Sequence, residues 1–151
     1  MVQVALWEPE IPPNTGNIAR LCAATGTRLH LIGRLGFRLD DRDLKRAGCD
    51  YWPAVDLHLH DTMEAFEATL PDVRVFCFSA HALVPYTTAR FQDSDCLLFG
   101  NESHGLPSSM LERCAERLLQ IPMPAGNVRS LNLATAAGIV LYEALRQVHK
   151  W

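Results

Sequence analysis

The sequence predicts an α/β domain with a mainly parallel sheet flanked by helices. Short apolar runs, each too short for a helix, alternate along the chain with longer stretches of helical periodicity. Several of these runs end at Gly or Pro, which mark the passage from a strand to a loop. The 151 residues, 48% of them hydrophobic, suffice for one packed core and are too few for two ordinary domains. We therefore expect a single domain over residues 1–151.

The N-terminal elements follow the order strand, loop, helix, strand. Val2 to Trp7 is predicted to be a buried strand, and the EPEIPPNTG segment after it a loop, because its three prolines interrupt a ladder or a helix. Asn14 or Thr15 can cap the next helix, and Gly26 ends it. The following strand covers Leu29 to Ile32. Such alternation is typical of parallel sheets.

The middle of the chain contains a basic helix and a one-sided strand. Residues 41–47 are predicted to be helical, and residues 55–60 alternate apolar with polar side chains. His58 and His60 share the polar face of that strand, and we interpret them as exposed histidines. Two histidines without a carboxylate or thiol partner at a defined spacing are weak evidence for a metal site, so no metal is expected.

The C-terminal half continues the alternation. Asp61 is expected to cap a helix that runs to about Leu70, with Glu64 in the capping-box position. A short helix at Ser108–Arg113 and further strands are expected at Val73–Ser79, Cys96–Gly100 and Leu118–Ile121. The last helix begins near Ser130 and is apolar on nearly every face, so it must be buried on more sides than a surface helix. A subunit interface is a natural explanation.

Two loops that follow strands form the best candidate for a ligand site. The first begins at Gly100, and Pro122 opens the second. In open α/β sheets small ligands bind beyond the carboxyl ends of the strands, where glycine lets the backbone approach a ligand closely. The loops 100–106 and 122–130 are therefore expected to lie side by side around a pocket.

Several function classes are disfavoured by motifs that the sequence lacks. It contains neither a GxxxxGK[ST] phosphate-binding loop nor a GxGxxG after the first strand. Ser103 lies in a GNESHG turn, yet a nucleophile elbow needs glycine two residues before its serine, and Asn101 stands there. A P-loop nucleotidase, a standard Rossmann dinucleotide enzyme and a serine hydrolase are therefore not expected.

Composition predicts a reduced, cytoplasmic protein. The five cysteines are widely spaced, form no CxxC pair and mostly lie in apolar runs, so we interpret them as free core thiols. They are Cys22, Cys49, Cys77, Cys96 and Cys114. The chain opens without a charged, apolar leader, and its longest uncharged apolar stretch, residues 130–142, is shorter than the roughly 20 residues that span a bilayer. We expect no membrane partner.

Charged and polar residues allow both a structural and a functional interpretation. The net charge is −3, but five basic residues gather between Arg34 and Arg46 among three aspartates, which suits either a mixed helix face or a phosphate-binding patch. Further polar side chains stand near the first helix or the two loops: Asn14, Asn17, Arg20, Glu102, Arg129, Ser130 and Asn132. Glu102 is placed to accept hydrogen bonds from a ligand or a neighbouring loop.

Three of these residues could have a purely structural role in place of a functional one. Arg20 is flanked by apolar residues, so its stem can simply cover the surface. Ser130 and Asn132 stand at the start of the last helix, where polar side chains often act as caps.

Three segments together resemble the motifs of one family, the SPOUT-class methyltransferases with a deep trefoil knot. NTGNIAR (14–20) is similar to their first motif, LLFGNESHGLP (97–107) to their second, and IPM…RSLNLATAAGIVLYEALRQ (121–147) to their third. The resemblance covers essentially the whole chain and is greatest to small single-domain tRNA 2′-O-methyltransferases that act on the wobble nucleotide. It implies methyl transfer from S-adenosylmethionine to the ribose 2′-hydroxyl of cytidine or carboxymethylaminomethyluridine.

The resemblance also implies an architecture and a cofactor site. The C-terminal half would form the knot and bind S-adenosylmethionine in a bent conformation. The chain would form a homodimer packed partly through its first and last helices, with the tRNA anticodon loop as its other partner. Adenine and ribose would be held by backbone groups around Phe78, Gly100, Ile121 and Met123, with Ser130 and Leu131 closing the pocket.

The same resemblance assigns catalytic and RNA-binding roles. The positions that match catalytic motif residues are Asn14, Arg20, Glu102 and Asn132. Glu102 and Asn132 would lie near the methionine part and the methyl acceptor, and Arg20 matches an arginine proposed to assist deprotonation of the 2′-hydroxyl. Tyr142 matches a position near the RNA-binding dimer interface, and the basic segment Arg38 to Arg46 would contact tRNA phosphates.

Arg20 is a poor candidate for a general base. A guanidinium stays protonated and has no acceptor site. Methyl transfer needs an oxygen nucleophile in line with the methyl group and the removal of a proton. We therefore hypothesise that Arg20 orients the hydroxyl and the adjacent phosphate, and that the proton leaves to that phosphate or to water.

The chain departs from the family pattern in its second motif. Asn101 and His104 stand where Pro and Arg are frequent, which makes the local positive charge depend on pH if His104 faces RNA. Two other functions stay open at this point. One is the same chemistry at another tRNA or rRNA position, and the other is a non-catalytic RNA-binding dimerisation module that keeps the pocket for stability.

Overall fold

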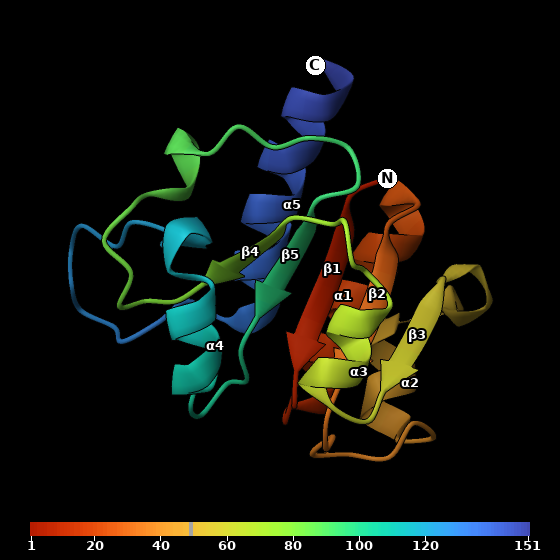
Figure 1. Cartoon of the computed structure of the whole chain (residues 1–151). Coiled ribbons are helices and arrows are strands. Elements are labelled where there is room, and N and C mark those ends of the chain that lie inside the picture. Colours follow the sequence, from red (N-terminus) through yellow and green to blue (C-terminus); the bar gives the residue numbers. More distant parts are fainter. Residues whose placement is uncertain (49) are drawn as a thin grey trace.

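The central sheet is entirely parallel, which confirms the predicted α/β class (Figure 1). In the computed structural model, which describes residues 1–48 and 50–151, it contains six strands in the order β3-β2-β1-β5-β4-β6. They are β1 (Gln3–Trp7), β2 (Arg28–Ile32), β3 (Leu57–His60), β4 (Val75–Phe78), β5 (Cys96–Phe99) and β6 (Leu118–Leu119). β1 thus lies between β2, which follows it, and β5, which comes much later in the chain.

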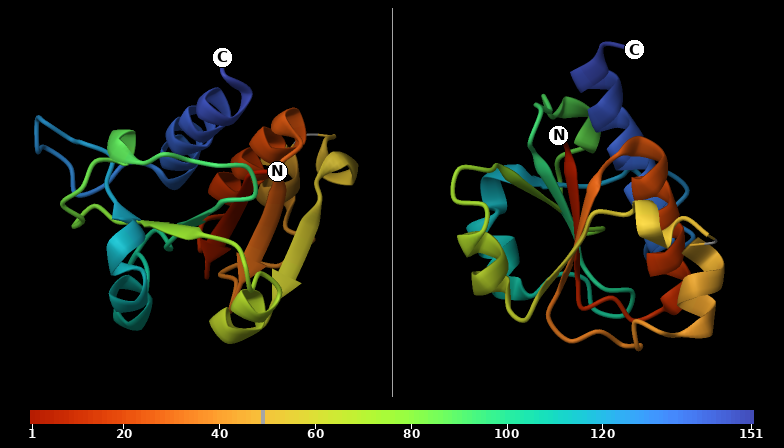
Figure 2. Two further views of the ribbon diagram at one scale, coloured as in Figure 1. Left: turned by 45° about the horizontal axis from the view of Figure 1, so that its top comes forward. Right: turned by 90° about the vertical axis from the view of Figure 1, so that its right-hand side faces the viewer.

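The helices divide between the two faces of the sheet (Figure 2). One face, here the long-helix face, is covered by α1 (Pro12–Thr25) and α5 (Leu133–His149), with α2 (Arg42–Gly48) packed on α1. The other, here the short-helix face, is covered by α3 (Met63–Ala68) and α4 (Ser108–Arg113). Because side chains alternate along a strand, Val4 and Leu6 of β1 point to the long helices and Ala5 to the short ones.

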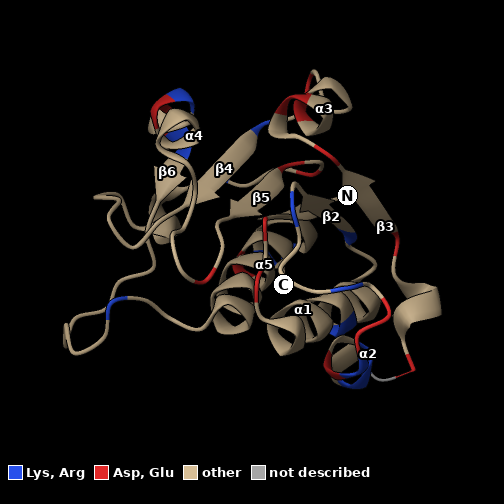
Figure 3. Cartoon of the chain, turned by 90° about the horizontal axis from the view of Figure 1, so that it is seen from below, with Lys and Arg blue, Asp and Glu red and all other residues tan. Residues whose placement is uncertain are grey.

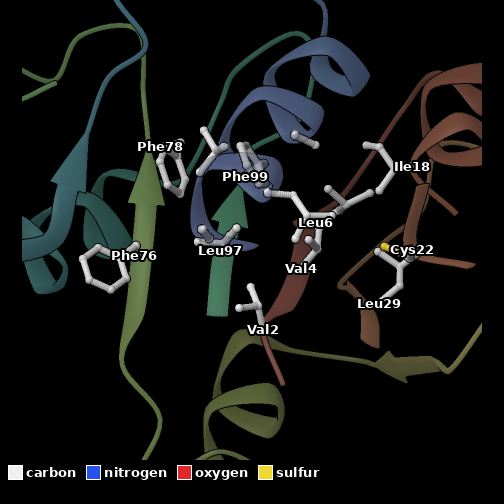
Figure 4. Close-up of a cluster of buried hydrophobic side chains, with 14 of the residues drawn as sticks. Val2, Val4, Leu6, Ile18, Cys22, Leu29, Phe76, Phe78, Leu97 and Phe99 are labelled. Carbon is white, nitrogen blue, oxygen red and sulfur yellow. The ribbon is translucent and has the colours of Figure 1, made fainter. Parts of the chain in front are cut away.

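The core of the long-helix face is aliphatic and aromatic (Figure 4). Leu6 of β1, Ile18 of α1 and Leu141 of α5 are all fully buried in it. Full burial of such a side chain contributes about 1.5–3 kcal/mol, so this core holds both helices on the sheet. α1 and α2 also pack very closely, because a Cβ on Gly16 would lie 2.5 Å from the Ala47 Cβ.

The core of the short-helix face contains buried thiols. It packs around Phe66 of α3 and Met110 of α4. The free, buried cysteines of the described residues are Cys22 on the long-helix face and Cys77, Cys96 and Cys114 on the short-helix face. These four confirm the interpretation as free core thiols, whereas Cys49 lies outside the described residues.

The start of α1 differs from the prediction because two prolines belong to the helix. Pro12 and Pro13 occupy its first turn, where a backbone N–H has no helical partner and proline's missing donor is harmless. The N-cap is therefore Ile11, which has no capping side chain, and the expected caps Asn14 and Thr15 lie inside the helix. The end of the helix is as predicted, at a glycine in the left-handed conformation.

The start and end of α3 also differ from the prediction. Thr62 caps the helix in place of Asp61, because its backbone is extended and its hydroxyl accepts from the Ala65 N–H at 3.1 Å. The helix ends at Ala68, short of Leu70.

The C-terminal elements are shorter than predicted. α5 begins at Leu133 and not near Ser130, because Asn132 adopts the N-cap position. β6 has two residues, and Gln120 continues it only as an isolated bridge to Pro85. No helix in the described ranges combines the length and the apolar character needed to cross a membrane.

The alternation predicted that both histidines of β3 are exposed, and this is wrong for His60. The His58 side chain is 41% exposed and lies 2.7 Å from Asp56. His60 Nε2 lies 2.9 Å from His30 Nδ1, and both rings make edge contacts with Phe66. α3 covers this face, so the polar residues bind one another beneath it. Leu59 is the exposed side chain of the strand, with 53% of its surface accessible.

Candidate functional site

The predicted ligand loops begin at the carboxyl edge of the sheet, where α/β folds bind small ligands. β5 and β4 end in register at Phe99 and Phe78, whose rings stack with centroids 4.8 Å apart. β6 pairs with β4 on its other side through Leu119. Gly100 and Ile121 follow the ends of these strands, so three of the predicted cofactor residues belong to neighbouring strand ends.

Gly100 opens a turn that leaves no room for a side chain. A Cβ at this position would lie 2.1 Å from the backbone carbon of Gly105. Asn101 and Gly105 exchange backbone hydrogen bonds of 3.3 and 3.0 Å, and Asn101 Oδ1 accepts from the His104 N–H at 2.7 Å. The loop is therefore a tight turn in which Gly100 packs directly on the backbone of Gly105.

Glu102 provides the cap that α1 lacks. Its Oε1 accepts from the Glu10 N–H at 3.0 Å, and its Oε2 accepts from the Ile11 N–H at 2.7 Å and from Asn14 Nδ2 at 3.3 Å. The unpaired N–H groups and the dipole at a helix N-terminus favour an anion. Of the two partners expected for Glu102, a ligand or a neighbouring loop, the structure shows the loop.

Asn14 and Asn132 connect the three motif segments. Asn132 Nδ2 donates to Asn14 Oδ1 at 2.9 Å, while Asn132 Oδ1 accepts from the Thr135 N–H at 3.1 Å and so caps α5. Because Asn14 also contacts Glu102, a chain of side chains runs from the loop after β5 to the start of α5. We call Glu102, Asn14 and Asn132 the motif network. Three of the four predicted catalytic residues thus lie together.

Arg20, the fourth predicted catalytic residue, lies on another side of α1. It is exposed, whereas Asn14 is buried, and six residues of helix separate them by about one and two-thirds turns. Its guanidinium carbon lies 5.5 Å from the centroid of the Tyr51 ring. Arg20 therefore projects beside the motif network and not into it.

The other predicted cofactor residues belong to the segment that connects β6 with α5. In Figure 1 this segment extends away from the sheet and returns to the start of α5. Within the described ranges, the backbone groups of Ile121, Ser130 and Leu131 form no backbone hydrogen bonds, and the Met123 carbonyl accepts from the Gly126 N–H at 3.1 Å. Such backbone donors and acceptors can serve a polar ligand.

A separate hollow lies on the short-helix face. It has a volume of about 280 Å³ between α3 and α4 and is lined by Trp7, Thr62, Met110 and Arg113, among others. None of the predicted site residues lines it, so it is not the predicted cofactor pocket. In the described part of the chain, His, Cys, Asp and Glu side chains form no cluster of three or more that could hold a metal ion.

The basic segment lies on the outer side of the long-helix face, over α2 (Figure 3). Arg42, Lys45 and Arg46 are exposed there. Arg38 pairs with Asp40 at 3.1 Å, and an exposed pair of this kind contributes about 0–1 kcal/mol. The surface thus carries cations beside aspartates, as the sequence predicted.

Glu10 is a site residue that the sequence analysis missed. Its carboxylate accepts from the Ser103 N–H at 2.9 Å and from Ser103 Oγ at 3.0 Å. It lies in the Pro-rich segment before Asn14, where no periodicity marks it. Its signal in the sequence was its place four residues before the first motif, in the EPEIPPNTGN segment to which the family resemblance extends.

Comparison with known proteins decides the family. The SpoU rRNA Methylase family matches residues 1–142. The chain belongs to the SpoU methylase family. A protein from Synechocystis sp. is 52% identical over 150 residues, which are 98% of this chain and 97% of that protein. A tRNA (cytidine(34)-2′-O)-methyltransferase from Escherichia coli (strain K12) is 47% identical over 98% of this chain and 94% of that protein.

Solved structures agree with membership of the SpoU methylases. One described as "Structural insights into the 2-OH methylation of C/U34 on tRNA" superposes with a TM-score of 0.95 at 54% identity, covering 100% of this chain and 98% of that one. An AdoMet-bound rRNA methyltransferase from Sinorhizobium meliloti gives a TM-score of 0.85 at 34% identity, covering 96% of this chain and 56% of that one. The resemblance drawn from the three motifs is thereby confirmed, and the family implies the C-terminal trefoil knot.

Proposed function

We propose that this SpoU methylase transfers a methyl group from S-adenosylmethionine to the ribose 2′-hydroxyl of nucleotide 34 in tRNA, either cytidine or carboxymethylaminomethyluridine. Full-length similarity carries the proposal. Proteins from Escherichia coli and Methylovorus glucosotrophus that bear the name tRNA (cytidine(34)-2′-O)-methyltransferase match at least 97% of this chain at 47% and 46% identity.

The carboxyl edge of the sheet fits S-adenosylmethionine. The loop that begins at Gly100 follows the end of β5 at this edge, and Ile121, Ser130 and Leu131 offer backbone groups without backbone hydrogen bonds in the described chain. Adenine and ribose present polar edges that such groups can bind. When bound, S-adenosylmethionine supplies a methyl group made electrophilic by its sulfonium. The protein's part is to hold it and to align the acceptor.

Glu102 acts in this proposal as a positioning residue. Both of its carboxylate oxygens already accept hydrogen bonds from the start of α1. It therefore holds the loop after β5 on α1, and through Asn14 it also fixes Asn132 at the start of α5. The motif network sets the geometry between the methyl donor and α1.

Arg20 orients the acceptor in this proposal. Its guanidinium can only donate, and its planar fork matches two oxygens of a phosphate. The 2′-hydroxyl proton then leaves to the adjacent phosphate or to water. The exposed position of Arg20 beside Tyr51 is one that an RNA backbone can reach.

The homodimer and the RNA surface belong to the same proposal. Tyr142 in the middle of α5 and Trp151 just after the helix are 46% and 65% exposed, and their ring centroids lie 6.3 Å apart. A second copy packed through α1 and α5 would cover these aromatic rings. The segment Arg38 to Arg46 would contact tRNA phosphates, whose binding is largely electrostatic. We place the reaction in the cytoplasm, with the anticodon loop as substrate.

Nucleoside mass spectrometry tests the reaction directly. Bulk tRNA from a strain lacking this protein is incubated with the pure protein and S-adenosylmethionine, and any added methyl group is mapped. We expect new 2′-O-methylcytidine or 2′-O-methyluridine derivatives at nucleotide 34. A methyl group at another tRNA or rRNA position would keep the chemistry and replace the substrate. No methyl transfer to any RNA, together with no binding of S-adenosylmethionine by calorimetry, would leave only a non-catalytic module.

Arg20→Lys tests the role of the guanidinium. Lysine keeps the positive charge but cannot donate two parallel hydrogen bonds to a phosphate as a guanidinium does. Because a hydrogen bond to a charged group contributes about 1.5–3 kcal/mol, we expect kcat/KM for tRNA to fall roughly 10- to 150-fold. Methyl incorporation into tRNA measures this, with Arg20→Ala as the reference for complete loss. Calorimetry with S-adenosylmethionine is the control and should give unchanged affinity. Wild-type activity in Arg20→Lys would show that charge alone suffices.

A further inference from the structure

We infer that Glu10 is a positioning residue for methyl transfer, because its carboxylate locks the loop after β5 onto the start of α1. The inference rests on the proposed function and adds a residue that lies outside the three family motifs. Glu10 touches neither of the predicted substrate sites, so it acts through the loop that it holds.

Glu10 binds a single residue of that loop with both carboxylate oxygens. Oε1 accepts from the Ser103 N–H at 2.9 Å and Oε2 from Ser103 Oγ at 3.0 Å. Two bonds to one residue fix its rotation as well as its position. The backbone hydrogen bond, followed by the hydroxyl bond and the nearby His104 charge, lowers the pKa of Glu10. The ionised carboxylate is therefore the form that holds the loop.

The contact is reciprocal, because Glu102 in the same loop binds the segment that carries Glu10. Its carboxylate accepts from the backbone N–H groups of Glu10 and Ile11 and from the Asn14 side chain. Together with the two bonds to Ser103, five hydrogen bonds join segments that are about 90 residues apart. We call Glu10, Ile11, Asn14, Glu102 and Ser103 the glutamate clasp.

The backbone of Glu10 is itself held from behind by the loop after β2. The Gly36 N–H donates to the Pro9 carbonyl at 2.9 Å, and a Cβ on Gly36 would lie 2.7 Å from the Glu10 Cα. These contacts with Gly36 restrain the backbone of Glu10. The Glu10 side chain therefore binds Ser103 from a backbone position that is itself restrained.

The clasp connects the part of the protein that would hold the methyl donor with the part that would hold the acceptor. The loop that it holds begins at Gly100, on the methyl-donor side, and α1 carries Asn14 and Arg20 on the acceptor side. A misplacement of about 1 Å between reacting groups can lower a rate about 100-fold. Loss of the Glu10 carboxylate should therefore lower kcat, while α1 keeps its cap because Glu102 remains.

Glu10→Ala is the decisive variant, because glutamine could keep both bonds, its amide oxygen accepting from the Ser103 N–H and its amide nitrogen donating to Ser103 Oγ. We expect kcat for methyl transfer to tRNA to fall about 10- to 100-fold with an unfolding midpoint close to wild type. Glu8→Ala is the matched control, since Glu8 lies in the same segment and its carboxylate accepts from the Arg34 N–H at 2.8 Å. It should stay within about twofold of wild type. A wild-type kcat in Glu10→Ala, or an equal loss in Glu8→Ala, would overturn the inference.

Ser103→Ala supplies a second variant that removes only the hydroxyl bond. We expect a smaller loss of kcat than in Glu10→Ala, and the double variant should be no worse than Glu10→Ala alone, because residues that interact are not additive. If the losses of kcat in the two single variants add up in the double variant, the two residues act independently, which would contradict the clasp.

Hydrogen exchange separates failure of the clasp from failure of the proposed function. Glu10→Ala should speed exchange of the Ser103 amide, whether or not the protein methylates tRNA. Unchanged exchange at Ser103 would overturn the clasp itself. Faster exchange in a protein that methylates no RNA would keep the clasp and reject the reaction, and with it the kinetic role of Glu10.

Discussion

The two faces of the sheet differ in the length of their helices and in the groups that they bury. The long-helix face carries helices of 14 and 17 residues over an apolar core, and its polar contacts gather at the helix starts in the motif network. The short-helix face carries two helices of six residues each. Its interior holds His30 and three thiols, all of them titratable.

This difference indicates that the long-helix face positions the residues of the proposed site, whereas the short-helix face contributes to stability. α1 and α5 begin at the carboxyl edge, and the side chains of Asn14 and Asn132 connect their starts, so any shift of either helix moves the proposed site. α3 and α4 contribute none of the predicted site residues. Damage to the short-helix face should therefore lower stability and leave the chemistry of the folded protein intact.

A pair of core truncations offers the strongest test of this comparison. Phe66→Ala on the short-helix face and Leu141→Ala on the long-helix face should lower the free energy of unfolding by about 3–5 and 2–5 kcal/mol, because both side chains are fully buried. Denaturant unfolding measures both losses. At a temperature where each variant is folded, only Leu141→Ala should lose methyl transfer. An equal loss in Phe66→Ala would show that the two faces are not separable.

The pH dependence of stability should come from the short-helix face. Burial, with the charges of His60, His58 and Arg28, lowers the pKa of His30 to about 4 against the opposing effect of Asp56. The unfolded chain then binds the proton more readily, so this stabilisation is complete above about pH 6.5 and is lost as the pH falls toward 4. The difference corresponds to about 3 kcal/mol.

The hydrogen bonds of His30 determine the tautomer of its neutral ring. The Gln3 amide oxygen can only accept, so His30 Nε2 carries the hydrogen and His30 Nδ1 must accept from His60 Nε2. Protonation of Nδ1 would remove that acceptor. Unfolding free energies measured between pH 7.5 and 4.5 should fall for wild type and change less in His30→Gln. His81→Gln is the control, because exposed His81 is not among the groups that act on His30, and its slope should match wild type.

A pair of cap removals should give the smallest effect on stability. Thr62 caps α3 and Asn132 caps α5, and replacing either by alanine should cost about 1 kcal/mol. Only Asn132→Ala also breaks the bond to Asn14, so it alone should lower methyl transfer at a temperature where both variants are folded. Equal activity in the two variants would remove the motif network from the proposed mechanism.

Local patterns were sufficient for most of the fold. Apolar runs bounded by Gly and Pro identify the strands, and helical spacing identifies the long helices. The prolines at 12 and 13 were assigned to a loop because proline disrupts a helix interior, whereas the first turn accepts it. His60 was assigned to solvent because alternation shows which residues share a face and not what covers that face.

The site was predictable in its members and not in its contacts. Asn14, Glu102 and Asn132 came from motif resemblance, and their hydrogen bonds join positions 88 and 118 residues apart, which no local pattern shows. Glu10 was missed for the same reason. The position of Arg20 outside the motif network depends on the rotation of α1 against its neighbours, which the sequence does not reveal.

The central place of β1 has a consequence for biosynthesis. β1 is made before the other five strands of the sheet and is flanked by β5, so one of its edges stays without a partner until residue 99 has left the ribosome. Such long-range pairing slows folding, and an unpaired apolar edge invites association between nascent chains. Elongation speed through the middle of the message therefore sets how long each new molecule is exposed to aggregation.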